Sequence, residues 1–133
     1  MSQPKQYIHH ELASGRWHAM TLANQVANVG SEYERALRWK GQGNAEYFED
    51  ALARMLELLD LMIEDPRWSN RRLKKLRRLR EIICGELFSE VRQYSNSRDL
   101  RKYFFRVGIM ANEQRYAARN YRSAIGNRQS EMN

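Results

Sequence analysis

A dense run of positive charge lies between positions 71 and 80, where seven residues are lysine or arginine and none is acidic. Leucines at 73, 76 and 79 recur at the spacing of a buried helical face, so most of the cations fall on the outer face. We call these outer cations the basic stripe: Arg71, Arg72, Lys74, Lys75, Arg77 and Arg78. Such a stripe can bind phosphates through counterion release and predicts a nucleic-acid-binding surface.

The stripe also has a plainer interpretation. Like charges four residues apart destabilise a helix by about 0.2–0.5 kcal/mol per pair, so something beyond local stability favours the arrangement. Acidic residues of the same bundle, or of a neighbouring subunit, could neutralise it. The two interpretations differ in whether the cations stay open to solvent.

A second candidate surface lies within residues 98–122. Phe105, Ile109 and Tyr116 recur on the side opposite the predicted core face, and a helix that is apolar on two faces has two partners. The surface is either a subunit interface of a homo-oligomer or a platform on which unpaired bases stack. Four arginines run beside it and extend the predicted nucleic-acid contact: Arg101, Arg115, Arg119 and Arg122.

Arg80 differs from the stripe because helical spacing places it among the leucines of the buried face. A buried guanidinium needs a counter-ion. Glu32 and Asp60 each lie at the edge of an apolar helical face, so we expect one of them to form a structural ion pair with Arg80.

Other polar and aromatic residues fit structural roles. Gln25, Asn28 and Glu32 follow one flank of a helix, which predicts hydrogen bonds within the bundle. The three tryptophans lie near predicted helix ends and are expected to close the ends of the bundle: Trp17, Trp39 and Trp68.

Catalytic and cofactor motifs are absent from the sequence. All three histidines lie before residue 19, and none has the helical spacing of a metal pair. The single cysteine, Cys84, falls on an apolar helix and is expected in the core. There is no phosphate-binding loop, dinucleotide turn or nucleophile elbow. We therefore predict no metal, no cofactor and no catalytic residue, with a toxin-like nuclease that lacks a recognisable motif as an alternative.

The elements that must position these residues are predicted to be helices throughout. Apolar residues repeat every three or four positions, for example at Phe48, Leu52, Met55, Leu59 and Met62. Thr21 and Asn44 are predicted N-caps, and Pro66 ends one helix. The expected fold is a single all-α domain, 1–133, built as an antiparallel four-helix bundle with a short extra N-terminal helix. The expected helices are 5–13, 21–40, 44–65, 69–93 and 98–122, followed by a frayed tail, 126–133.

Charge is divided unevenly along the chain. Residues 1–65 hold six Lys or Arg against ten Asp or Glu, whereas residues 66–133 hold seventeen against six. The asymmetry points to a polyanion or an acidic protein surface as partner. No apolar run is long enough to span a bilayer and no signal peptide is evident, so a cytoplasmic location is expected.

Several segments also resemble a known group of sequences. Residues 17–21, 25–32, 56–61 and 77–81 together resemble a family of small uncharacterised prokaryotic helical proteins, over about residues 10–105. That resemblance implies no established activity. In size, helix count and basic character the chain is similar to the four-helix-bundle accessory proteins of diversity-generating retroelements and to proteins encoded in ribosomal-RNA intervening sequences. This architectural similarity implies an oligomeric bundle with a basic surface facing nucleic acid.

The sequence thus predicts a non-enzymatic, homo-oligomeric bundle that binds nucleic acid, RNA rather than DNA, as an accessory subunit of a ribonucleoprotein or reverse-transcriptase system. The alternative is a protein-interaction or oligomerisation module whose basic surface docks an acidic or larger protein partner, or the acidic half of a second copy in a homo-oligomer.

Overall fold

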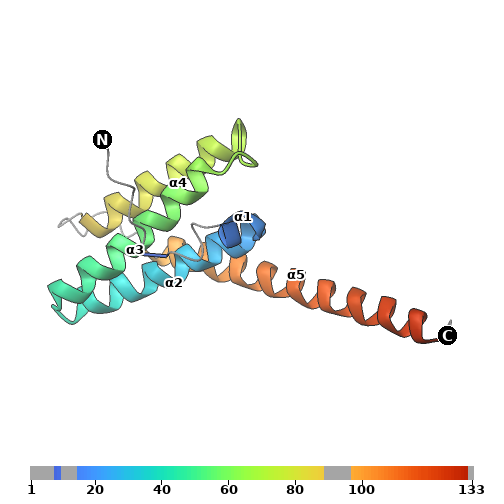
Figure 1. Ribbon diagram of the computed structural model, residues 1–133. Helices are drawn as coiled ribbons and strands as arrows, with labels where there is room; N and C mark the ends of the chain where they lie inside the picture. Colours follow the sequence, from blue (N-terminus) through green and yellow to red (C-terminus); the bar gives the residue numbers. More distant parts are fainter. Residues whose placement is uncertain (1–7, 10–14, 89–96, 132–133) are drawn as a thin grey trace.

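The computed structural model describes residues 8–9, 15–88 and 97–131, and within them the chain is all-α (Figure 1). A short helix, α1, spans Trp17–Ala19. Four long helices follow: α2 (Leu22–Gly41), α3 (Ala45–Glu64), α4 (Arg71–Phe88) and α5 (Ser97–Glu131). The expected all-α fold with four long helices is confirmed.

Helix α2 is the centre of the packing. It lies against α3 and α5, while α4 packs mainly on α3. A short turn joins α2 to α3, and Arg101 and Arg115 of α5 reach Glu34 and Asn24 of α2 respectively, so both neighbours run antiparallel to α2. The C-terminal part of α5 continues beyond the start of α2 and projects away from the other helices (Figure 1).

The helix boundaries follow from local chemistry. The Thr21 hydroxyl accepts a hydrogen bond from the Asn24 N–H at 3.1 Å, and the Asn44 side chain accepts one from the Tyr47 N–H at 3.1 Å. Both predicted N-caps are confirmed. Asp65, before Pro66, has extended backbone angles and ends α3.

The core is formed where the apolar faces of the helices meet. Met55, Leu59 and Met62 of α3 are fully buried, as their spacing predicted, and Leu76, Leu79, Ile83 and Leu87 form the buried face of α4. Gly30 of α2 faces Phe104 of α5 so closely that an added Cβ would lie 2.8 Å from the phenyl ring. The absence of a side chain at position 30 therefore sets the distance between α2 and α5.

A buried polar cluster joins α1, α2 and the α3–α4 turn. The Gln25 amide donates to the Trp17 carbonyl at 2.8 Å and to Asp65 at 3.3 Å, and it accepts from the Trp68 indole at 2.8 Å. Arg67 completes the cluster with a 2.8 Å ion pair to Asp65. The expected role of Gln25 within the bundle is confirmed, as is that of Trp17 and Trp68 in closing this end.

Some predicted boundaries are wrong. Of the expected helix 5–13, only Ile8 and His9 are described, and they form a bend. Residues 17–19, expected to be a connection, are helical. Helix α5 does not end at 122 but runs to Glu131, because a glycine such as Gly126 weakens a helix by only about 1 kcal/mol. Helix α4 starts at Arg71 rather than 69, and residues 89–93 lie outside the described part.

None of the helices, within the residues described, is both long enough and apolar enough to cross a lipid bilayer.

Candidate nucleic-acid interface

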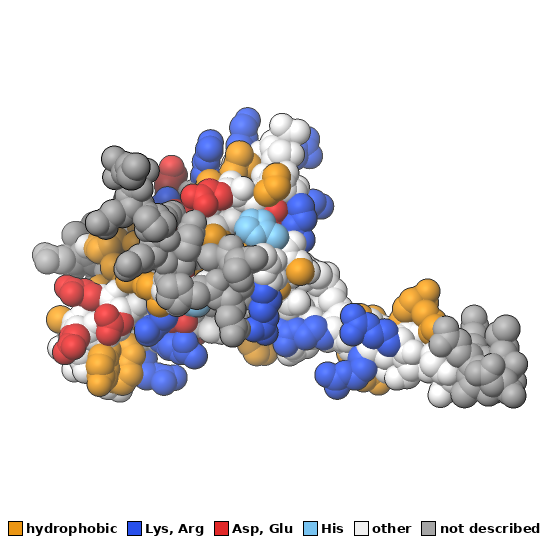
Figure 2. Space-filling view, in the orientation of Figure 1, with side chains coloured by type: hydrophobic (Ala, Val, Ile, Leu, Met, Phe, Trp, Pro, Cys, Tyr) orange, Lys and Arg blue, Asp and Glu red, His pale blue; other side chains and the backbone are white. Residues whose placement is uncertain are grey.

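The basic stripe lies along the outer face of α4. Leu76 and Leu79 point into the core, which turns all six stripe residues outward, and each of them is exposed. Figure 2 shows Lys and Arg side chains projecting from the upper part of the molecule, where α4 begins. The same periodicity that builds the core therefore sorts the cations onto one face.

No carboxylate among the described residues forms an ion pair with a stripe residue; the ion pairs formed there involve other cations. Arg72 instead lies 5.5 Å from the centre of the Trp68 ring, which also carries Arg67 at 4.5 Å. The contact with Trp68 holds Arg72, at the start of the stripe, against an aromatic ring without neutralising its charge. The positive charge of α4 thus faces solvent.

Arg80 pairs with Asp60, as predicted, at 2.9 Å between Nη1 and Oδ1. The expectation that Arg80 is buried is wrong, because its side chain is 40% exposed and that of Asp60 is 38% exposed. A long arginine stem can lie along apolar surface and bring its guanidinium to the rim. The other predicted partner, Glu32, pairs instead with Arg35 at 2.8 Å and Arg54 at 3.4 Å.

The four predicted arginines of α5 fall into two groups. Arg101 forms a 2.7 Å ion pair with Glu34, and Arg115 donates two hydrogen bonds to the Asn24 side-chain oxygen at 3.0 and 2.8 Å, so both are held against α2. Arg119 and Arg122 are exposed and, with Arg115, line a shallow hollow of about 280 Å³. Only the second group has no partner on α2 among the described residues.

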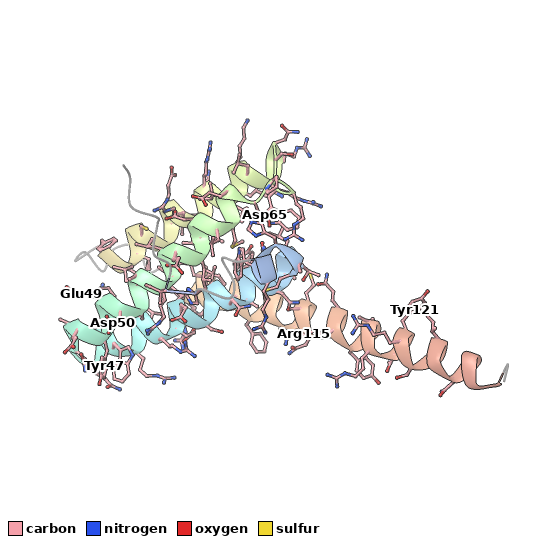
Figure 3. All side chains as sticks on the ribbon, in the orientation of Figure 1. Tyr47, Glu49, Asp50, Asp65, Arg115 and Tyr121 are labelled. Carbon is pink, nitrogen blue, oxygen red and sulfur yellow. The ribbon has the colours of Figure 1, made fainter. Side chains whose placement is uncertain are left out.

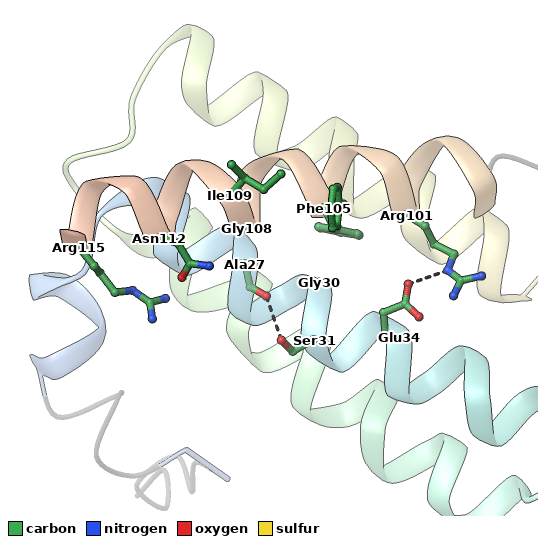
Figure 4. Close-up of a pocket in the computed structure, with 11 residues that line it drawn as sticks. Ala27, Gly30, Ser31, Glu34, Arg101, Phe105, Gly108, Ile109, Asn112 and Arg115 are labelled. Atoms are coloured by element: carbon green, nitrogen blue, oxygen red, sulfur yellow. Dashed lines mark hydrogen bonds and ion pairs between the residues drawn. The ribbon is translucent and has the colours of Figure 1, made fainter. Parts of the chain in front are cut away.

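The predicted second face of α5 is open. Phe105 is 70% exposed, Tyr116 68% and Ile109 46%. Phe105 and Ile109 border a groove of about 590 Å³ between α2 and α5, with the small residues Ala27 and Gly30 on its α2 side (Figure 4). Arg101, paired with Glu34, lies at one end and Arg115 at the other, and the polar residues Ser31 and Asn112 also line the groove.

The structure has a second groove, between α4 and α5, that the sequence did not predict. It has a volume of about 450 Å³, and Arg72 and Lys75 of the stripe line it together with Tyr103 and Met110 of α5. The available signal was the spacing of Tyr103 and Met110, seven residues apart on a third face of α5. Helical periodicity can mark this face as partly apolar, but it cannot indicate that the stripe lies across from it.

Groups that could act as acids, bases or ligands are dispersed. No set of three or more His, Cys, Asp or Glu side chains in the described residues is arranged to hold a metal ion. His9 contacts Glu57, whose carboxylate accepts hydrogen bonds from the backbone N–H groups of Ile8 and His9 at 2.8 and 2.7 Å. Burial alone would raise the pKa of Glu57, but these hydrogen bonds outweigh it and lower the pKa. Cys84 is half-buried.

Neither a protein-family model, nor a curated protein, nor a solved structure matches the chain.

Proposed function

We propose that the protein is a non-enzymatic nucleic-acid-binding bundle that prefers RNA and acts in the cytoplasm as an accessory subunit of a larger ribonucleoprotein. The observation that carries this proposal is the exposure of six α4 cations without a neutralising carboxylate among the described residues. A polyanion is the partner that such a surface binds most favourably, because each phosphate contact releases counterions.

The groove between α4 and α5 supports single-stranded RNA in particular. Arg72 and Lys75 on one side offer contacts to phosphates, and Tyr103 on the other is 44% exposed and offers a ring on which a base can stack. Proteins bind single strands by this combination of a cationic track and aromatic faces. Specific recognition of RNA mostly uses such unpaired, splayed bases, whereas the bases of a duplex are stacked internally.

Neutralisation of the stripe tests the proposal. The variant Lys74→Gln/Lys75→Gln/Arg77→Gln/Arg78→Gln should bind single-stranded RNA more weakly and with a flatter dependence of log affinity on log salt. Each phosphate contact of a single strand contributes about 0.7 to that slope, so four lost contacts should reduce it by about 3. Fluorescence anisotropy over a salt series measures both quantities.

The matched comparison is between two doubly substituted variants. Lys74→Gln/Arg78→Gln removes two charges from the stripe, whereas Arg38→Gln/Lys102→Gln removes two exposed charges from α2 and α5. Only the first should change the salt slope. Equal slopes for the quadruple variant and the parent, with helicity unchanged by circular dichroism, would contradict the assignment of the stripe to RNA.

A protein-interaction module is the second candidate, and it is favoured by the exposed Phe105, Ile109 and Tyr116. Its acidic protein partner would bind the basic half without any requirement for phosphate. A defined complex with an acidic protein, combined with no RNA affinity at physiological salt, would favour this function over the first.

A further inference from the structure

The C-terminal part of α5 is an uncovered helix. From residue 116 to residue 127 every side chain is exposed, including Tyr121 at 69% and Ile125 at 38%. We call residues 116–127 the α5 tail. Packing of an apolar face supplies most of the stability of a helix in a protein, so a partner surface is expected to cover this one. The exposed arginines Arg119 and Arg122 lie on the same segment as these apolar residues.

The opposite end of the molecule carries the complementary charge. Glu46, Glu49 and Asp50 are exposed at the start of α3, and none forms an ion pair within the described part of the chain. We call these three residues the acidic corner. In Figure 2, acidic and hydrophobic side chains adjoin at the left end, where α2 turns into α3, while the α5 tail projects to the right.

The acidic corner also has an aromatic hollow. The Tyr47 ring, 49% exposed, meets the Trp39 ring edge-on at 4.8 Å, and the two line a hollow of about 250 Å³ with Asp50 and Arg54. Arg54 is directed to Glu32 at 3.4 Å, which leaves the Asp50 carboxylate without a described cation. Aromatic faces beside a carboxylate are the surroundings that an arginine side chain prefers, because it stacks and forms bidentate hydrogen bonds at once.

The two surfaces match each other but cannot meet within one chain. Tyr47, Glu49 and Asp50 lie at one end of the molecule and Tyr121 lies near the other (Figure 3). Arginines and tyrosines on the tail complement carboxylates and aromatic rings on the corner. Contact between them therefore requires two copies.

We propose that the α5 tail of one copy docks on the acidic corner of a second copy, with Arg119 or Arg122 entering the hollow beside Trp39 and Tyr47. This contact joins two different surfaces. One contact per pair of copies generates a ring or an open chain, whereas two reciprocal contacts close an antiparallel pair. The contact leaves the basic stripe outside the interface, and the inference does not depend on RNA binding.

Charge reversal tests the docking. The corner variant Glu49→Arg/Asp50→Arg and the tail variant Arg119→Glu/Arg122→Glu each bring like charges together. Each should weaken self-association at least about tenfold, since like-charge contacts at an interface cost several kcal/mol. Sedimentation velocity or light scattering across a concentration series, at low and high salt, measures the association.

Mixing the two variants is the decisive experiment. The glutamates of the tail variant meet the arginines of the corner variant, and the remaining pair of surfaces keeps its natural charges. The mixture should therefore associate although neither variant does so alone. Parent-like helicity of both variants, measured by circular dichroism, separates a lost contact from a lost fold.

Three outcomes would overturn the inference: a parent that stays monomeric at its highest attainable concentration, a mixture that stays monomeric, or charge-reversed variants that associate like the parent. The quadruple stripe variant distinguishes the two proposals. It should self-associate like the parent, so failure of RNA binding and failure of docking are observed independently.

Discussion

Asp65 illustrates how one residue holds three segments together. Its side chain is fully buried and contacts Gln25 of α2 and Arg67 of the α3–α4 turn. Burial of the carboxyl would raise its pKa, but hydrogen bonds from Arg67 and Gln25 outweigh that effect and lower the pKa below the ordinary value of 3.8. The ionised form is therefore the one that the fold stabilises.

We expect the cluster to lose stability in acid. Because the pKa of Asp65 is lower in the folded than in the unfolded chain, its contribution is complete above the unfolded pKa and is lost as the pH falls through the folded pKa. Asp65→Asn should lower the free energy of unfolding at pH 7 by about 1–3 kcal/mol. The loss should shrink as the pH falls below about 4.

Urea unfolding at a series of pH values measures this dependence. Asp50→Asn, at an exposed position with no ion pair among the described residues, is the matched control. A constant difference between Asp65→Asn and the parent from pH 7 to pH 3 would show that the charge of Asp65 is not what stabilises the cluster.

The sequence predicted the ion-pair partner of Arg80 better than it predicted how far the Arg80 side chain is buried. Asp60 was one of two predicted partners of Arg80, because both Asp60 and Glu32 lie at the edge of an apolar helical face. How far the arginine would reach toward solvent depends on packing between helices, which spacing along one helix does not contain. The contact of Gln25 with Asp65, forty residues away, has no local signal at all.

Among the contacts between helices, the packing of α2 against α5 is the closest one that involves a glycine. Gly30 and Phe104 meet at this contact, where a Cβ at position 30 would lie 2.8 Å from the phenyl Cγ. Leu100, Phe104 and Ala111 continue the buried side of α5 along it. A glycine that costs helix stability is here a condition for close packing.

Gly30→Ala should lower the free energy of unfolding by about 1–3 kcal/mol, because the added methyl group forces the Phe104 ring or the helix axis to move. Gly85→Ala, within α4 and with nothing within 4 Å of the added Cβ, is the control. It should raise the free energy of unfolding by about 0.5–1 kcal/mol through helix propensity. Thermal unfolding of both variants tests the contrast, and a neutral Gly30→Ala would mean that the two helices are not in close contact.

Helix type and burial pattern were predictable for the same reason. The leucines of α4 and the methionines and leucines of α3 repeat with the helical period, and both faces were assigned correctly. The end of α5 was not predictable, since periodicity reports which side of a helix is apolar but not where its packing partner ends.

The whole molecule creates sites that no single helix contains. The groove between α4 and α5 places Tyr103 across from Arg72 and Lys75, which are thirty-one and twenty-eight residues earlier in the chain. The sequence indicates the cations but not the tyrosine, because the groove depends on how α4 and α5 pack around α2.

Tyr103→Leu should separate stacking from charge. Loss of one stacked base weakens binding of single-stranded RNA by about 1–3 kcal/mol, and the salt slope should stay at the parent value because no phosphate contact is removed. Fluorescence anisotropy at two salt concentrations checks both, and Tyr103→Phe, which keeps the ring, should bind like the parent. Equal affinity of the leucine variant and the parent would exclude Tyr103 from the binding surface.

The position of the stripe on α4, apart from both ends of the molecule, has a consequence for avidity. A chain of copies linked end to end would present one basic stripe per copy at a regular interval. One long RNA could then bind several stripes at once. After the first stripe is bound, the tethered RNA has a high effective concentration at each of the others. Modest affinity at each stripe would then be enough for slow dissociation of the whole RNA strand.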